Sequence, residues 1–117
     1  MPELTIDGHG THTVDAGKRL VLAIRDAGVE IGHRCGGLAK CTTCRVMFKE
    51  GEPSKITQAE KDKLEEKGLD DVRLACQISV DDAMWVIPLM TLGDQPWSDT
   101  GPEPAAEIEP EPVWLER

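Results

Sequence analysis

The sequence lacks tyrosine and has only one Phe and three Trp among its 117 residues. Aromatic side chains therefore add little to the core, and a domain of this size buries only roughly two thirds of its unfolded surface. A metal site or a similar internal cross-link would compensate for so modest a core.

The chain also lacks any run of about 18 apolar residues, which excludes a predicted transmembrane helix. The first residues, MPELTIDGHG, contain neither the basic flank nor the apolar segment of a secretory signal. We therefore expect a cytoplasmic protein, in which thiols stay reduced. In that setting the four cysteines favour metal or redox chemistry over disulfides.

Basic residues are scarce, with 13 Lys and Arg against 22 Asp and Glu. Residues 1–92 carry 15 acids and 12 bases, a net of −3, whereas residues 93–117 carry 7 acids and one base, a net of −6. The acidity disfavours nucleic acid as a partner, and we expect a monomer that binds neither nucleic acid nor membranes.

We divide the chain into a domain, 1–92, and an acidic, Pro-rich C-terminal extension, 93–117, which we expect to be extended.

The N-terminal third predicts a hairpin, a helix and a loop. Residues 2–17 alternate around a Gly-His-Gly centre, which is typical of a β-hairpin. The segment KRLVLAIRDAG, 18–28, predicts a helix that stops at Gly28. Its apolar residues recur at spacings of four and three: Leu20, Ile24 and Ala27. The glycine-rich stretch 29–44 has no periodicity and predicts a loop.

The following segments complete a mixed pattern of strands and helices. RVMFKEG, 45–51, predicts a short strand, and ITQAEKDKLEEKG, 56–68, predicts a surface helix. Thr57 and Glu60 form the sequence pattern of a capping box at its start. Two further strands are predicted in VRLACQISV and MWVIPL, residues 72–80 and 84–89. This order favours an α+β fold with a mixed sheet packed on one main helix.

The cysteines follow the pattern C-x5-C-x2-C within HRCGGLAKCTTCRVMF, with a fourth after 31 further residues. Four thiolates are what a [2Fe-2S] cluster requires, three from one loop and one from a distant strand. The cluster is an anion that gains one more negative charge on reduction, so it needs backbone N–H donors close to its sulfurs. Gly36 and Gly37 allow the main chain to turn inward there. The candidate ligands are Cys35, Cys41, Cys44 and Cys76.

Other uses of four cysteines fit the pattern less well. A zinc site usually has two C-x2-C pairs, but Cys76 stands alone. A thioredoxin-like CTTC should open a helix, whereas here it leads into a predicted strand. A Rieske centre needs two His, and no His accompanies Cys76. A two-disulfide scaffold suits a secreted chain. Unrelated buried thiols are the simplest alternative, but four thiols in and around this glycine-rich loop disfavour it.

The segments CGGLAKCTTCRV and RLACQI together resemble the [2Fe-2S] ferredoxins of the adrenodoxin and putidaredoxin type. In that family five residues separate the first two ligands, as here, whereas the plant-type spacing has four. The resemblance covers about residues 1–92 and implies a β-grasp, ubiquitin-like fold with the cluster near the surface. It also implies that Cys35, Cys41, Cys44 and Cys76 are the ligands.

The resemblance implies an electron-transfer protein and not an enzyme. Such a protein accepts one electron from a flavin-containing ferredoxin reductase and passes it to a partner oxidoreductase, such as a cytochrome P450 or an oxygenase. The alternative is a non-catalytic regulatory or structural module. In that case the cluster, or zinc in its place, stabilises the fold while the acidic tail binds a partner.

Three cations lie in or beside the cysteine loop, Arg34, Lys40 and Arg45. Cations favour the more negative reduced cluster, so we expect them to raise its reduction potential. The adrenodoxin group often has His where this chain has Arg45. We interpret Trp85 as a core residue of its strand. The three histidines are interpreted as solvated loop residues: His9, His12 and His33.

Two further groups of residues suggest contacts. Acids around the end of the second helix are candidates to face a basic patch on a reductase: Glu65, Glu66, Asp70 and Asp71. Apolar residues of the extension are candidates to fasten it to the domain: Trp97, Ile108, Trp114 and Leu115.

Overall fold

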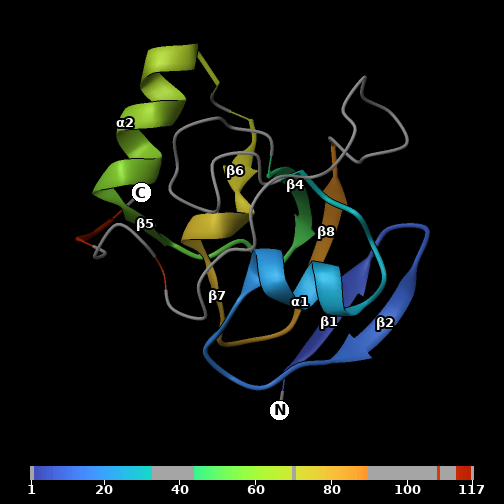
Figure 1. The fold of residues 1–117 in the computed structure, drawn as a ribbon. Coiled ribbons are helices and arrows are strands. Elements are labelled where there is room, and N and C mark those ends of the chain that lie inside the picture. Colours follow the sequence, from blue (N-terminus) through green and yellow to red (C-terminus); the bar gives the residue numbers. More distant parts are fainter. Residues whose placement is uncertain (1, 33–43, 70, 90–107, 109–112, 117) are drawn as a thin grey trace.

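The computed structural model describes residues 2–32, 44–69, 71–89, 108 and 113–116 (Figure 1). Its main feature is a five-stranded sheet in the order β2-β1-β8-β4-β6. The strands are β1 (Glu3–Ile6), β2 (Gly10–Thr13), β4 (Arg45–Glu50), β6 (Arg73–Leu74) and β8 (Met84–Pro88). The β1–β8 pair is parallel and the other three pairs are antiparallel, so the predicted mixed sheet is confirmed.

The predicted hairpin is confirmed as β1 and β2, paired from Glu3↔Thr13 to Ile6↔Gly10. Gly8 and Gly10 adopt φ angles of +80° and +83° at its turn. Glycine adopts this region without steric cost, so the Gly-His-Gly centre sets the turn. Leu4 and Ile6 point into the core, where they are fully buried.

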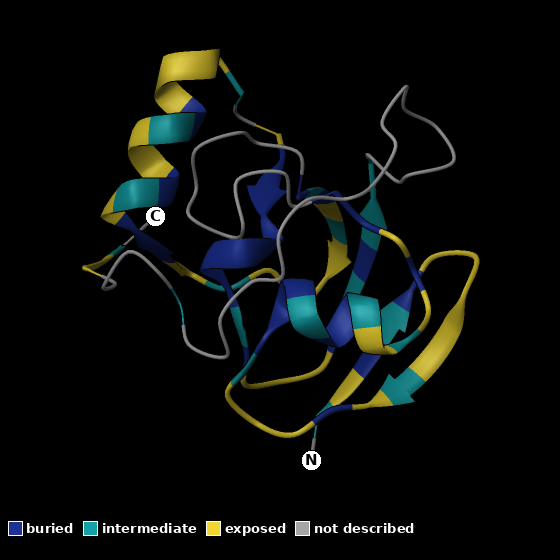
Figure 2. Ribbon diagram, viewed as in Figure 1, coloured by how far each residue is buried: buried dark blue, intermediate teal, exposed yellow. Residues whose placement is uncertain are grey.

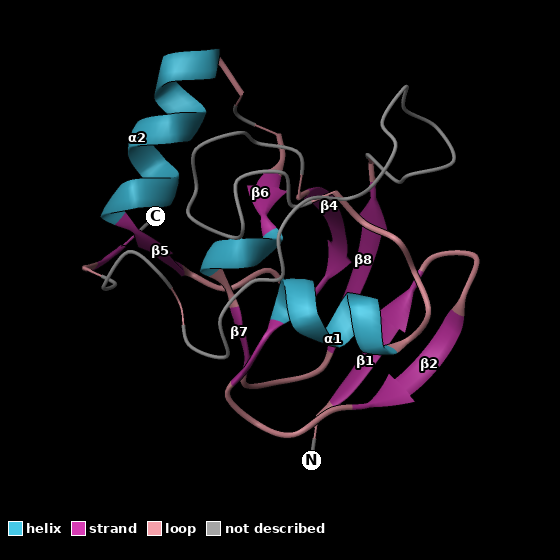
Figure 3. Cartoon of the chain, viewed as in Figure 1, coloured by secondary structure: helices cyan, strands magenta, loops and turns pink. Residues whose placement is uncertain are grey.

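Helix α1 (Leu20–Asp26) packs across the sheet, as Figure 3 shows. Its buried face consists of Leu20, Val21, Ala23 and Ile24. Gly28 follows the helix with φ +91° and donates its N–H to the Arg25 carbonyl, which confirms the predicted stop. The helix is shorter than predicted at its start, because Lys18 and Arg19 form strand β3 (Lys18–Arg19), which pairs with β7 (Ser79–Val80).

Helix α2 (Gln58–Lys67) begins at the predicted N-cap, Thr57, and ends at Gly68 with φ +68°. Only half of the predicted capping box forms. The Thr57 hydroxyl accepts the Glu60 N–H at 3.1 Å, but the Glu60 carboxylate turns into the protein and binds other donors. The helix exposes most of its surface, as predicted (Figure 2).

Part of the acidic extension is fastened to the domain. Strand β9 (Trp114–Glu116) pairs antiparallel with β5 (Lys55–Thr57), which leads into α2. Leu115 packs against the core, whereas Trp114 is 43% exposed. Trp97 lies outside the described residues, and Ile108 is half-buried.

The segment 72–80 is not the single strand that its sequence predicts. It forms β6, a 3-10 turn η1 (Ala75–Gln77) and β7, and these strands join different sheets. At this turn the chain changes its pairing partner: β6 before it pairs with β4, and β7 after it pairs with β3. Cys76 therefore lies on a turn and not on a strand.

Strand β8 is confirmed, and it ends at Pro88, one residue before the predicted end. The interpretation of Trp85 as a core residue is wrong, because Met84 and Val86 occupy the inner face and Trp85 lies half-buried on the other. The Lys49 ammonium lies 4.8 Å from the centre of the Trp85 ring. Within the described residues, no helix is long and apolar enough to cross a membrane.

Candidate functional site

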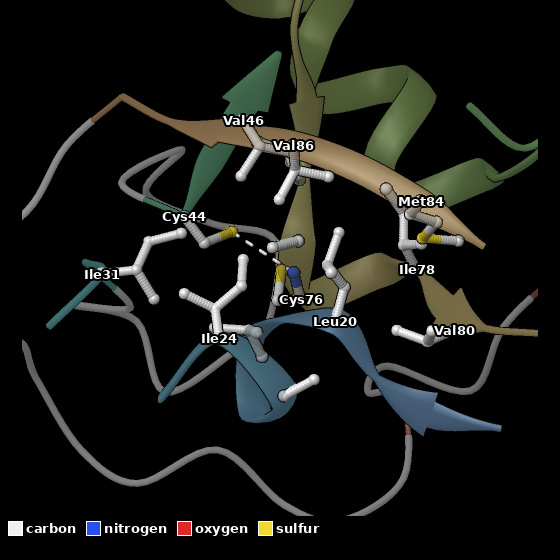
Figure 4. Close-up of a cluster of buried hydrophobic side chains, with 14 of the residues drawn as sticks. Leu20, Ile24, Ile31, Cys44, Val46, Cys76, Ile78, Val80, Met84 and Val86 are labelled. Atoms are coloured by element: carbon white, nitrogen blue, oxygen red, sulfur yellow. Dashed lines mark hydrogen bonds between the residues drawn. The ribbon is translucent and has the colours of Figure 1, made fainter. Parts of the chain in front are cut away.

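Two of the four predicted ligands, Cys44 and Cys76, lie next to each other in the core (Figure 4). Both side chains are buried. The Cys76 N–H donates to the Cys44 sulfur across 3.5 Å, although 32 positions separate them in the chain. Cys35 and Cys41 lie outside the described residues, so their part in the site stays a prediction.

The end of the β4–β6 ladder brings these two cysteines together. Arg45 pairs with Leu74, and the next residues along, Cys44 and Ala75, add a hydrogen bond from the Ala75 N–H to the Cys44 carbonyl at 3.0 Å. The 3-10 turn then directs the Cys76 N–H toward the Cys44 sulfur. Backbone pairing thus fixes the approach of the two thiols.

A buried glutamine also faces the Cys76 sulfur. The Gln77 side-chain N–H donates to this sulfur at 3.7 Å, and its amide oxygen accepts the Thr57 hydroxyl at 2.8 Å. Both Gln77 and Thr57 are fully buried. The sequence predicts Thr57 as a helix cap but gives no sign of its contact with Gln77, because that contact joins two segments 20 positions apart.

Arg19 places a buried guanidinium beside the same turn. Its Nε and Nη2 groups donate to the Cys76 carbonyl at 3.2 and 2.7 Å, and only 1% of the residue is exposed. This cation was not among those predicted to lie near the site. Of those three, Arg45 is half-buried, whereas Arg34 and Lys40 lie outside the described residues.

A buried ion pair supports the segment that leads to Cys76. Arg73 donates from Nε and Nη2 to the two Glu60 carboxylate oxygens at 2.8 and 3.1 Å. The Leu74 N–H donates to the same carboxylate at 2.7 Å. Arg73 also donates to the carbonyls of Pro53 and Lys55 at 3.1 and 3.0 Å. Helix α2 is thereby attached to β6, next to the turn that carries Cys76.

The two described histidines lie on the β1–β2 hairpin. His9 is exposed, and the half-buried His12 ring contacts the His9 carbonyl at 2.9 Å on the β1–β2 hairpin. His33 lies outside the described residues. The interpretation as solvated loop residues is confirmed for His9, which is exposed in the turn, but is wrong for His12, which lies half-buried on strand β2.

The chemistry of these groups fits an iron–sulfur cluster. The ligand of such a cluster is a thiolate, and N–H donors to sulfur and a nearby cation stabilise that charge in a buried place. The described part of the site provides two convergent thiols, two N–H donors to sulfur and the Arg19 guanidinium.

Comparisons with known proteins agree with this chemistry. A 2Fe-2S ferredoxin of Haemophilus influenzae is 44% identical over 73 residues, which are 57% of this chain and 65% of that protein. This chain thus spans slightly less than two thirds of that relative.

Solved structures share the fold. The ISC-like [2Fe-2S] ferredoxin FdxB of Pseudomonas putida is 27% identical with a TM-score of 0.62, over 74% of this chain and 91% of that one. A chain of the covalent putidaredoxin reductase–putidaredoxin complex is 26% identical with a TM-score of 0.59. The match covers 74% of this chain and 96% of that one. These matches confirm the predicted β-grasp ferredoxin fold.

The match to a protein family covers strands β1, β2, β4 and β6, both helices and the turn with Cys76, and it ends before β8. It extends over residues 4–81, and the family is described as the 2Fe-2S iron-sulfur cluster binding domain. The chain belongs to this family of [2Fe-2S] ferredoxin domains.

Proposed function

We propose that this protein carries single electrons on a [2Fe-2S] cluster held by Cys35, Cys41, Cys44 and Cys76. The observation that carries the proposal is the meeting of the Cys44 and Cys76 thiols, with the Cys76 N–H directed at the Cys44 sulfur. The cluster supplies one-electron redox chemistry when bound. Four cysteine ligands occupy every protein-facing position of the irons, so the protein acts as a carrier and not as an enzyme.

The residues around the site hold the ligands and tune their charge. The Ala75 N–H and the Arg19 guanidinium fix the backbone carbonyls of Cys44 and Cys76. Hydrogen bonds and nearby cations stabilise the more negative, reduced state and so raise the reduction potential. Arg45, directly after Cys44, adds a half-buried positive charge.

The electron donor that we propose is a flavin-containing ferredoxin reductase in the cytoplasm. The similarity to a chain of the putidaredoxin reductase–putidaredoxin complex supports a reductase partner. Exposed acids at the end of α2 offer a surface for a basic partner: Glu65, Glu66 and Asp71. The acceptor is an oxidoreductase, of which a cytochrome P450 or an oxygenase is our choice.

We also propose that residues 1–92 form the ferredoxin domain and that residues 93–117 are an extension that stays attached to it. The β5–β9 pairing supports this division, because it joins the end of the chain to the start of α2. We propose a monomeric carrier.

The test is an absorption and EPR spectrum of protein purified without air, before and after dithionite. We expect a red-brown protein that bleaches and gains the signal of one unpaired electron. A colourless protein, or one loaded with zinc, would instead favour a structural or regulatory module. Each ligand is tested by its own Cys→Ala variant, and a variant that keeps the native spectrum removes that cysteine from the set.

A further inference from the structure

We propose that Gln77 tunes the reduction potential of the cluster through its side-chain N–H donated to the Cys76 sulfur, and that the Thr57 hydroxyl holds the Gln77 amide in this orientation. The inference rests on the proposed ligation of the cluster by Cys76. Gln77 and Thr57 are positioning residues, since neither is a ligand.

The hydrogen bonds of Thr57 define which way the Gln77 amide points. The Thr57 oxygen accepts the Glu60 N–H at 3.1 Å, and its single hydroxyl proton goes to the Gln77 amide oxygen at 2.8 Å. The amide oxygen is thereby fixed toward Thr57, and the NH₂ group is directed at the Cys76 sulfur, 3.7 Å away. Reversing the amide would turn its oxygen toward a thiolate, which accepts and does not donate.

Burial makes this chain of hydrogen bonds effective. Thr57, Gln77 and Cys76 are all fully buried, so water does not compete for the sulfur or the amide. In such a low-dielectric setting each hydrogen bond polarises the next, and donation by the Thr57 hydroxyl strengthens the N–H on the far side of the amide. A neutral N–H donor favours the state with more negative charge on sulfur, which is the reduced state.

Different residues bind the backbone carbonyl and the sulfur of Cys76. Arg19 binds the Cys76 carbonyl from β3. Gln77, in the turn itself, donates to the Cys76 sulfur and is held by Thr57 at the start of α2. Arg19 donates to the backbone carbonyl of Cys76, whereas Gln77 donates to its sulfur atom. The effect of Gln77 on the potential is therefore separable from the support of the turn.

The experiment is a spectroelectrochemical titration of the cluster-loaded protein in four variants. We expect Gln77→Met, which keeps the volume but removes the donor, to lower the reduced-to-oxidised ratio at a fixed potential by about tenfold, or about 59 mV for one electron. Thr57→Val should lower the same ratio by roughly threefold, since this change weakens the Gln77–Cys76 hydrogen bond without deleting it. Thr57→Ser keeps the hydroxyl and should match the wild type. Gln58→Met, on the exposed first turn of α2, is the matched control and should also match it.

The double variant separates this chain of hydrogen bonds from a general loosening of the fold. If Thr57 acts through Gln77, Thr57→Val adds no further shift in the Gln77→Met background. A shift of the same size in both backgrounds would overturn the role of Thr57. An unchanged potential in Gln77→Met with an intact spectrum would overturn the role of Gln77.

Two other measurements test the inference if Gln77→Met does not retain its cluster. Thr57→Val alone still has to lower the potential, and an unshifted value counts against the proposal. In the reduced wild type, glutamine labelled with ¹⁵N at the side chain should give a nitrogen coupling to the unpaired electron, and its absence excludes the Gln77 contact. A wild type without the reduced-cluster EPR signal overturns the electron-carrier proposal itself, a result distinct from unshifted variants of a normal cluster.

Discussion

Neutralising Glu60 should destabilise the protein severely, because it removes the partner of a buried guanidinium. Glu60→Gln keeps the shape of the side chain but leaves one oxygen to face three donors, from Arg73 Nε, Arg73 Nη2 and the Leu74 N–H. Breaking a buried ion pair on one side costs about 3–5 kcal/mol. Arg73 keeps two carbonyl partners and the Glu52 carboxylate at 3.4 Å, so we expect the lower end, about 3 kcal/mol.

The assay is the rate at which the cluster-loaded protein loses its visible absorbance in guanidinium chloride, because cluster loss makes unfolding irreversible. If the Glu60–Arg73 pair breaks before the transition state, about 3 kcal/mol corresponds to roughly a hundredfold faster loss. Loss at the wild-type rate, with the variant's circular dichroism unchanged, would refute the assignment of this pair as a main support of the fold.

Glu66→Gln is the matched control on the same helix. The Glu66 carboxylate is exposed and pairs with Lys63 at 2.6 Å, so its removal should leave the rate unchanged. The side-chain hydrogen bond from Lys63, followed by its charge, lowers the pKa of Glu66. The pair therefore acts above the unfolded-state pKa and is lost as the pH falls through the folded one. Lys63→Gln should raise the pKa of Glu66 in an NMR titration, and an unchanged value would contradict this cause.

Three further predictions concern the potential, the extension and the backbone. Arg45→Gln should lower the reduction potential in protein-film voltammetry, and an unshifted wave would dismiss its electrostatic role. Deleting residues 93–117 removes β9 from β5 but should leave the cluster spectrum intact. The rate of electron transfer from a reductase, measured by stopped flow at low salt, should change. Equal rates would make the extension a packing element only. Gly51→Ala should lower the free energy of unfolding by about 1–3 kcal/mol for its φ of +77° and by more for the overlap of its Cβ with the Ala83 carbonyl, with chemical denaturation of the metal-free chain as the measurement.

Elements with local signals were predicted from the sequence. The Gly-His-Gly turn, the stop at Gly28 and the N-cap at Thr57 each rest on residues within a few positions of one another, so their chemistry is visible in the chain itself. The cysteine spacing likewise led to a ferredoxin fold, which the family match confirms.

Features that depend on distant partners were missed. Strands β3 and β7 are two residues long and exist only because they pair with each other, and the turn at Cys76 interrupts a pattern that reads as one strand. The sequence predicts Glu60 as part of a capping box, and its burial against Arg73, 13 positions further along the chain, has no local signal. A charged side chain is buried only where an opposite charge can pair with it, and the sequence alone does not show which residue that partner is.

The arrangement of the main sheet also bears on how the chain is made. Its first strand, β1, and its last, β8, are neighbours, and β8 alone joins β1 to β4 within this sheet (Figure 1). Until Pro88 has left the ribosome, the halves on either side of β8 have no common edge, and the core that contains Cys44 and Cys76 lacks Met84 and Val86. We therefore expect a nascent chain halted before Met84 to be digested by proteases and to take up no iron, whereas one released after Leu89 folds around it.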